Sequence, residues 1–171
     1  MAAASPLQRL LPSIESGDRN FIRDAWDRLH RIPGGKTIFS KMVGRAAPYT
    51  GTIGAKVVSL SHLQSEVVLE DRPAVRNHLR CVHAVALVNL AELTGNVALA
   101  YSMPDDARFI VAGLEIEYIK KARGTITGVC DCPPVESSER REYPVPVSLR
   151  NPAGEEVARC TLRTLVGPKR K

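Results

Sequence analysis

Residues 75–101 read VRNHLRCVHAVALVNLAELTGNVALAY, and this stretch decides the fold. Its first part is polar, whereas the part from Val82 to Tyr101 is apolar on nearly every side and predicts one long helix. A helix with apolar residues all round is buried on most of its sides. We therefore expect the rest of the chain to wrap around this helix.

Segments on both sides of the helix have the composition and alternation of β-strands. Two such segments precede it, separated by a short Ser-His turn that predicts a hairpin, and four follow it. Their expected bounds are Thr52–Leu60, Leu63–Glu70, Arg108–Lys121, Gly124–Cys132, Arg140–Arg150 and Glu156–Val166. This order predicts an α+β protein in which one antiparallel sheet surrounds a central helix.

The first 48 residues differ from the rest in their hydrophobic pattern and predict an N-terminal helical extension. From Asp18 to Ile32, apolar residues recur at helical spacing, and Pro33-Gly34-Gly35 ends the pattern. A second short helix is expected from Lys36 to Arg45. The predicted organisation is an extension over 1–48, a main domain over 49–168, and a basic, frayed tail over 169–171.

Composition limits the classes of partner. The chain has 171 residues, of which 44% are hydrophobic, so it can form a core, and it lacks a membrane-length run of apolar residues. The net charge is +6, but Lys169, Arg170 and Lys171 carry part of it, and aromatic residues are only 5%. We therefore expect neither nucleic acid nor membrane as a partner. The N-terminal stretch lacks a signal-peptide core, which favours the cytoplasm and reduced thiols for the four cysteines.

Polar groups gather where the long helix begins. The loop before the helix brings Asn77 and His83 to its N-terminus, where unpaired N–H donors can polarise a carbonyl oxygen. Further along, Glu92 lies with Asn89 and Asn96 on one narrow polar stripe of an otherwise apolar helix. A carboxylate in that setting suits a general base or a nucleophile. The alternative is a structural glutamate that is hydrogen-bonded at a subunit interface.

These residues resemble the pattern of hot-dog-fold acyl-CoA thioesterases, in particular the phenylacetate-pathway type and its relatives. That pattern has an Asn, a His-Gly-Gly six residues later at the helix start, and then Leu-Ala and an acid. Here His83 follows Asn77 by six positions, and Glu92 follows Asn77 by fifteen and ends a Leu-Ala-Glu run. The resemblance covers roughly residues 49–166. It departs from the pattern at Ala84 and Val85, which replace the two glycines.

The resemblance implies an acyl-CoA thioesterase of the hot-dog fold. The thioester carbonyl would contact the Ala84 N–H, and Glu92 would activate a water or attack directly, acting from the neighbouring subunit. Asn77 would hold the water or the carbonyl, and His83 would shape the loop. CoA is part of the substrate, so no separate cofactor is expected. Because one unit exposes a sheet edge and an incomplete cleft, we expect a homodimer, or a tetramer of two dimers.

A basic cluster, Lys120, Lys121, Arg123 and Gly124, is expected at the end of a strand and its turn. Hot-dog thioesterases often receive the CoA phosphates there, and Arg and Lys bind phosphate through charge-assisted hydrogen bonds. Arg76 and Arg80 could contribute to the same site. Strand alternation would place Lys120 and Lys121 on opposite faces. The alternative is a solvated strand end.

Other interpretations of these residues are less well supported by their spacing. His78, Cys81 and His83 with Cys130 and Cys132 do not have a standard zinc spacing. Cys81 beside His83 lacks the third group that a cysteine nucleophile needs. A hot-dog dehydratase pairs an acid and a histidine differently. The main alternative is a non-catalytic hot-dog module that binds an acyl-thioester or another hydrophobic acid, which the Ala84-Val85 departure favours.

Overall fold

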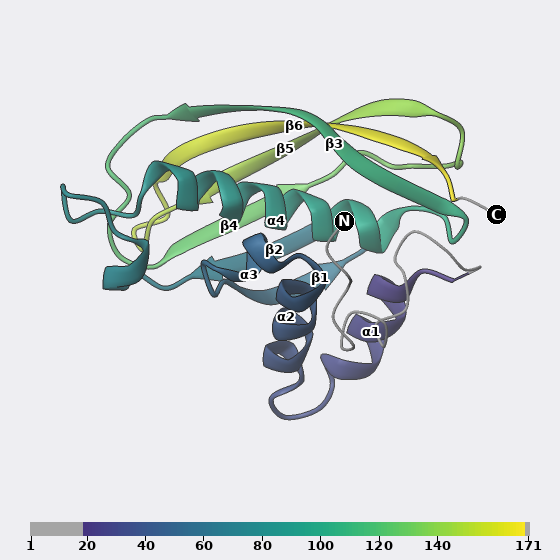
Figure 1. The fold of residues 1–171 in the computed structure, drawn as a ribbon, viewed down its shortest axis with the longest axis horizontal. Coiled ribbons are helices and arrows are strands. Elements are labelled where there is room, and N and C mark those ends of the chain that lie inside the picture. The colour runs from purple at the N-terminus through teal and green to yellow at the C-terminus, as the bar shows by residue number, and fades with distance from the viewer. Residues whose placement is uncertain (1–18, 170–171) are drawn as a thin grey trace, which may run out of the picture.

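A computed structural model describes residues 19–169, which form a six-stranded antiparallel sheet around one long helix (Figure 1). This confirms the predicted fold class, including the helices that precede the sheet. The elements are α1 (Phe21–Leu29), α2 (Gly35–Ala46), α3 (Pro48–Gly51), β1 (Lys56–Ser61), β2 (Gln64–Leu69), the 3-10 turn η1 (Pro73–Val75), α4 (Ala84–Ser102), β3 (Ala107–Tyr118), β4 (Ile126–Asp131), β5 (Arg141–Arg150) and β6 (Glu156–Pro168).

The central helix α4 is buried along most of its surface, as the sequence predicts. Its exposed or half-buried positions between 86 and 100 are Val88, Glu92 and Asn96, which lie on one stripe, and every other residue in that range is buried. Among the described residues, α4 is the one helix long and apolar enough to cross a membrane. Its place inside the sheet explains that composition (Figure 1).

The strands are ordered β1-β2-β4-β5-β6-β3, and every neighbouring pair is antiparallel. Both predicted hairpin strands form, but β1 begins at Lys56 rather than Thr52 because a short helix, α3, occupies the preceding chain. At the other edge, β3 ends at Tyr118, three residues before the predicted end. The N–H groups of Ile119 and Lys120 both donate to the Val157 carbonyl oxygen, which ends the regular ladder.

The helices of the extension pack on the rest of the fold. Trp26 and Phe39 meet edge to face with ring centroids 5.0 Å apart, and both are buried in the common core. The predicted first helix is present but ends at Leu29, so Ile32 lies outside it and is 49% exposed. Asp18, its expected first residue, lies outside the described residues. The proposed domain boundary at residue 48 stays a prediction.

The first helix is also tied to the end of α4. The side chain of Asn20 caps α1 by accepting a hydrogen bond from the Arg23 N–H. Its Nδ2 donates to the carbonyl oxygens of Ala100, at 2.6 Å, and Met103, at 3.2 Å. The extension therefore has polar as well as apolar links to the central helix.

The second helix, α2, covers the outer edge of the sheet at β1. Ser40 Oγ accepts a hydrogen bond from the Val57 N–H at 2.9 Å, and Lys36 Nζ donates to the Val58 carbonyl oxygen at 2.6 Å. These bonds satisfy backbone groups that an edge strand otherwise leaves open. The opposite edge, β3, pairs only with β6 among the described residues.

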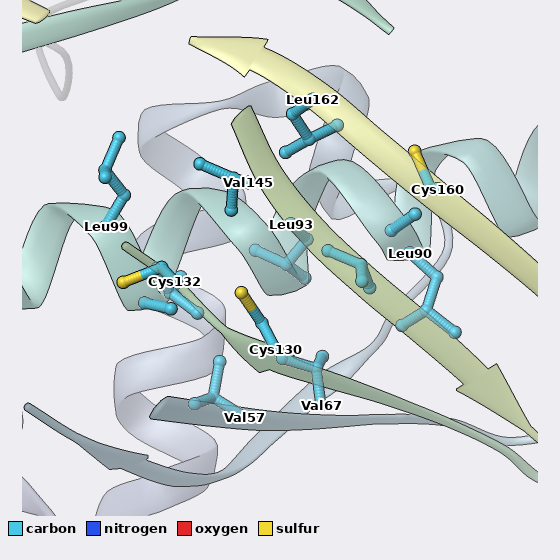
Figure 2. Packing of buried hydrophobic residues seen from close by; sticks show 14 of the residues in the cluster. Val57, Val67, Leu90, Leu93, Leu99, Cys130, Cys132, Val145, Cys160 and Leu162 are labelled. Atoms are coloured by element: carbon cyan, nitrogen blue, oxygen red, sulfur yellow. The ribbon is translucent and has the colours of Figure 1, made fainter. Parts of the chain in front are cut away.

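The core lies between α4 and the inner face of the sheet. Figure 2 shows Cys130, Cys132 and Cys160 pointing among Leu90, Leu93, Val145 and other apolar side chains. All four cysteines are free and buried. At the C-terminus, the predicted fraying does not extend to Lys169. Its N–H donates to the Asp106 carbonyl oxygen at 2.7 Å, and its Nζ donates to the Arg19 carbonyl oxygen at 2.8 Å. Residues 170–171 lie outside the described part of the chain.

Candidate functional site

The loop that leads into α4 is organised by Asn77. Its Oδ1 accepts hydrogen bonds from the Leu79 N–H at 2.9 Å, the Cys81 N–H at 3.3 Å and the Cys81 thiol at 3.3 Å. The Asn77 N–H donates to the Cys81 carbonyl oxygen at 2.9 Å and closes the loop. Of the polar groups of Asn77, Nδ2 alone has no hydrogen-bond partner among the described residues.

His83 is the N-cap residue of α4. Its Nδ1 accepts a hydrogen bond from the Val85 N–H at 3.1 Å, and its own N–H donates to the Val75 carbonyl oxygen at 2.8 Å. His83 therefore links the start of α4 to the Val75 backbone. Within residues 19–169, the N–H groups of Ala84 and Ala86 have no acceptor. The helix start thus keeps two free donors beside its positive dipole end.

Glu92 lies half-buried on the open stripe of α4 and has no hydrogen bond or ion pair with any described residue. Cys160 is close enough that the carboxylate charge adds to burial, the larger cause, in raising the pKa of that thiol to about 11. Glu92 follows Ala84 by eight positions, which is about 12 Å along the helix. A carbonyl bound at the Ala84 N–H is therefore out of direct reach of the Glu92 of the same chain.

The polar stripe expected from the sequence is divided in the structure. Asn89 is 4% exposed and lies under α3, where its Nδ2 donates to the Tyr49 carbonyl oxygen at 3.2 Å. Glu92 and Asn96 remain half-buried on the open face. The Oδ1 atoms of Asn89 and Asn96 are buried without a hydrogen-bond partner in the described chain.

The basic residues after β3 lie beside the loop that precedes α4, since the Ala122 carbonyl oxygen accepts from the Val82 N–H at 2.9 Å. Lys120 is paired with Glu155 at 3.0 Å, whereas Lys121 and Arg123 are exposed and have no ion pair within the described range. The prediction that Lys120 and Lys121 sit on opposite faces of a strand was wrong, because the strand has already ended at Tyr118.

Asp71, a residue to which no sequence motif points, connects this basic turn to the loop. Its Oδ2 accepts from the Gly124 N–H at 2.9 Å, and its Oδ1 accepts from Arg76 Nε at 2.6 Å. The hydrogen bond from Arg76 is the main cause that lowers the pKa of Asp71 below its ordinary value. Gly124 has a φ of +73°, which suits glycine. No local signal could have found this bridge, because its partners are 53 residues apart.

Two hollows lie near the helix. A small cavity of about 240 Å³, open to solvent, lies at the start of α4, between the helix, α3 and the loop that contains η1. A larger, open groove of about 1640 Å³ lies between α2, α3 and the first two strands, and Lys41, Arg45 and Lys56 are among its lining residues. Glu92 lines neither of these two hollows.

The cysteines serve packing and loop structure. Cys81 donates to Asn77 within the loop, and Cys130 and Cys132 point into the core (Figure 2). Burial raises the pKa of both core thiols. Among the residues that the structure describes, no group of three or more His, Cys, Asp or Glu side chains is placed to hold a metal ion.

Solved structures resemble this chain over most of its length. The structural genomics target APC5556 is 30% identical, covers 86% of this chain and 99% of its own, and superposes with a TM-score of 0.76. A Pseudomonas aeruginosa protein described as a probable thioesterase is 19% identical, with 80% and 97% coverage and a TM-score of 0.69. A Bacillus halodurans protein solved with CoA is 24% identical, with 59% and 66% coverage and a TM-score of 0.53.

These similarities confirm the hot-dog fold of the thioesterases. A search of curated proteins finds no match. The family described as a domain of unknown function (DUF4442) matches residues 35–166. The match includes α2 and the sheet except for the last two residues of β6, and it spans more than half of the chain. This hot-dog protein therefore belongs to the DUF4442 family.

Proposed function

We propose that the protein is a thioester hydrolase that cleaves an acyl-CoA to the free acid and CoA, in the cytoplasm, as a homodimer or a pair of dimers. One observation carries the proposal: a helix start with free N–H donors shares an open helix face with a carboxylate that has no partner in the described chain. The first feature polarises a carbonyl oxygen, and the second can take a proton from water.

A second copy of the chain completes the proposed site. The β3 edge is open, and Phe109, Leu114 and Ile116 on this strand are only partly buried against the core. Antiparallel pairing of two β3 strands would continue the sheet and bring the open faces of two α4 helices together. Glu92 of one copy would then face the helix start of the other, which removes the separation of about 12 Å within one chain.

The reaction follows from these placements. The thioester carbonyl oxygen accepts a hydrogen bond from the Ala84 N–H at the positive end of α4. Glu92 takes a proton from water as the water oxygen bonds to the carbonyl carbon. The carbon–sulfur bond then breaks, and the departing CoA sulfur receives the proton from Glu92. In the alternative route, a Glu92 carboxylate oxygen bonds to the carbonyl carbon, the carbon–sulfur bond breaks and CoA leaves as its thiolate, and water then hydrolyses the anhydride to the free acid and Glu92. The Asn77 Nδ2 holds the water or the carbonyl, and His83 fixes the loop.

The CoA phosphates are assigned to the basic turn after β3. Lys121 and Arg123 are exposed and without ion pairs in the described chain, so they are free to bind phosphate, while Lys120 exchanges Glu155 for phosphate and Gly124 keeps the turn in shape. The similar Bacillus halodurans protein was solved with CoA, which supports a CoA ligand here. No separate cofactor is needed, because CoA belongs to the substrate.

A second candidate is a binding module without hydrolysis. Val85 occupies the second residue of α4 and is 50% exposed, at a position where the resembling enzymes have glycine. Its side chain could block the approach of water to a bound thioester while leaving the acyl-CoA held. This candidate keeps the same ligand and differs only in turnover.

Hydrolysis of an acyl-CoA panel, from short to long and aromatic acyl groups, tests the proposal through release of free thiol. Wild type should turn over at least one member, and Glu92→Gln should lower kcat by about 10²- to 10⁴-fold. Glu66→Gln is the matched control, because Glu66 is exposed on β2 and should leave the rate unchanged. Saturable binding of every member without turnover would instead establish the binding module.

A further inference from the structure

The positive charge of this protein is concentrated in one stretch of the chain. Between Asp27 and Glu66 the sequence has six cationic residues and no acidic one, and this excess equals the net charge of the whole chain, +6. All six are exposed, and they are Arg28, Arg31, Lys36, Lys41, Arg45 and Lys56. The rest of the sequence has equal numbers of acidic and basic residues. The charge therefore belongs to the end of α1, to α2 and to the start of β1.

None of these six cations is neutralised within the described chain. Every ion pair of residues 19–169 takes its cation from outside the stretch, as Arg159 does with Glu117. Lys36 donates to a backbone carbonyl oxygen, that of Val58, which leaves its charge in place. A surface on which cations lack acidic neighbours has a positive potential that attracts an anionic partner.

The same stretch contains the loop that joins α1 to α2, which lies at the end of the molecule away from β5 and β6 (Figure 1). All four residues from Arg31 to Gly34 are exposed. Ile32 in this loop is 49% exposed, and Ile38, in the first turn of α2, is 52% exposed. We call residues 28–38 the α1–α2 tip. It therefore presents two large apolar side chains among cations.

Hydrogen bonds and close packing fix the shape of the α1–α2 tip. The Ile32 N–H donates to the Leu29 carbonyl oxygen at 3.1 Å, and the Gly35 N–H donates to the Ile32 carbonyl oxygen at 3.0 Å. A Cβ on Gly35 would collide with the Leu29 carbonyl oxygen, so the turn is tightly closed. Behind it, Trp26 packs edge to face on Phe39 and holds α1 against α2. A partner therefore meets a surface that is already formed.

An anionic lipid surface fits this combination better than a second copy or a nucleic acid. A two-fold contact through the tips of two copies would place like charges face to face. A nucleic acid offers phosphates to the cations but no apolar layer to the isoleucines, and Tyr49 is the one exposed Phe, Trp or Tyr of the stretch for base stacking. A bilayer offers both, because anionic headgroups attract clustered Lys and Arg and the acyl boundary takes up apolar side chains.

We propose that the α1–α2 tip docks on the surface of an anionic lipid bilayer. Ile32 and Ile38 enter the boundary between headgroups and acyl chains, and the cations around them face the headgroups. This contact is peripheral and needs no membrane-spanning segment. It revises the expectation of no membrane partner, because that expectation rested on the average composition and not on where the charge lies. The inference goes beyond the proposed function and does not depend on it.

Co-sedimentation with vesicles tests the docking. Vesicles of phosphatidylcholine with about 30% phosphatidylserine should bind the protein at least about tenfold more tightly than vesicles of phosphatidylcholine alone. Lys41→Gln with Arg45→Gln should weaken binding to the anionic vesicles by about 10- to 30-fold, because each cation near such a surface contributes about fivefold. The matched control is Arg159→Gln with Arg163→Gln, which lowers the net charge equally on exposed positions of β6 and should change binding by less than about threefold.

Ile32→Ser with Ile38→Ser separates a bilayer from other polyanions. This variant should bind the anionic vesicles about tenfold more weakly and leave any binding to duplex DNA unchanged. Ile110→Ser is the control, because Ile110 is 65% exposed on β3, away from the tip, and its loss should not change vesicle binding.

Two results would overturn the inference. One is wild-type protein that binds anionic vesicles no better than neutral ones. The other is binding that depends on the cations but not on the two isoleucines, which would indicate a surface for polyanions in general. The wild-type comparison of the two kinds of vesicle decides whether an anionic bilayer is bound even if a variant fails to fold.

Discussion

Replacement of Gly95 by alanine is expected to shift α4 relative to the sheet while the helix itself still forms. Gly95 lies one turn after Glu92, where the helix approaches β5 and β6. A Cβ at this position would lie 2.5 Å from Leu162 Cδ1, 3.2 Å from Val145 Cγ1 and 3.3 Å from Val147 Cγ2. All three neighbours are buried and have little space into which they can move.

The size of the effect follows from these distances. Carbon atoms in ordinary contact are about 3.5–4.0 Å apart, so the helix or Leu162 must shift by about 1–1.5 Å. Overpacking of this kind costs about 1–3 kcal/mol, and alanine returns about 1 kcal/mol through its helix propensity. The free energy of unfolding should fall by about 0–2 kcal/mol. Under the proposed function, misplacement of Glu92 by about 1 Å should lower kcat/KM by up to about 100-fold.

Urea unfolding and thiol release measure the two effects on the same preparation. Leu162→Val removes the clashing atom, so the double variant should lose less stability than the sum of the single variants by more than about 0.5 kcal/mol, and it should regain activity. Gly167→Ala is the control, because no atom lies within 4 Å of its added Cβ. Additive losses in the double variant would refute the reasoning from the close approach.

Two further predictions concern titrating groups. Because the hydrogen bond from Arg76 lowers the pKa of Asp71 in the folded state, ionised Asp71 stabilises the fold above its ordinary pKa of about 3.8, and this contribution is lost as the pH falls through the lower folded value. The urea midpoint of wild type should therefore exceed that of Asp71→Asn at pH 7, and the two midpoints should converge in strong acid. A difference between the midpoints that does not change with pH would contradict the stabilising bond between Asp71 and Arg76. All four cysteines are buried, and the pKa of Cys160 is raised to about 11, so thiol reagents at pH 7.5 should label the native protein far more slowly than the urea-unfolded chain. Rapid labelling of the native protein would contradict the burial of the four cysteines.

The fold was predictable because its strongest signals are local. Periodicity located α4 to within two residues at its start and one at its end, since burial on all sides leaves an unmistakable apolar run. The hairpin of β1 and β2 was equally clear, although Leu63 rather than Gly completes its turn with a φ of +66°. The end of β3 was harder to predict, because it depends on where the hydrogen bonds to the Val157 carbonyl oxygen depart from the regular ladder.

The candidate site was only partly predictable. His83 was placed correctly at the helix start because capping depends on a few neighbouring residues. The sequence could not show that Asn89 lies under α3 and away from Glu92, because that depends on a contact with Tyr49, 40 residues earlier. The cavity has the same origin, since α3 and η1 each supply part of its wall.

The bonds from Ser40 and Lys36 to the backbone of β1 bear on how far the protein can assemble. A sheet with two open edge strands corresponds to a bifunctional monomer in polymer chemistry, because it can add a strand at each edge and grow without limit. A sheet with one open edge strand is monofunctional and stops after a single addition. Because α2 already bonds the Val57 N–H and the Val58 carbonyl oxygen, we expect strand addition to be disfavoured at this end of the sheet. Its growth by strand addition through β3 would end at two copies.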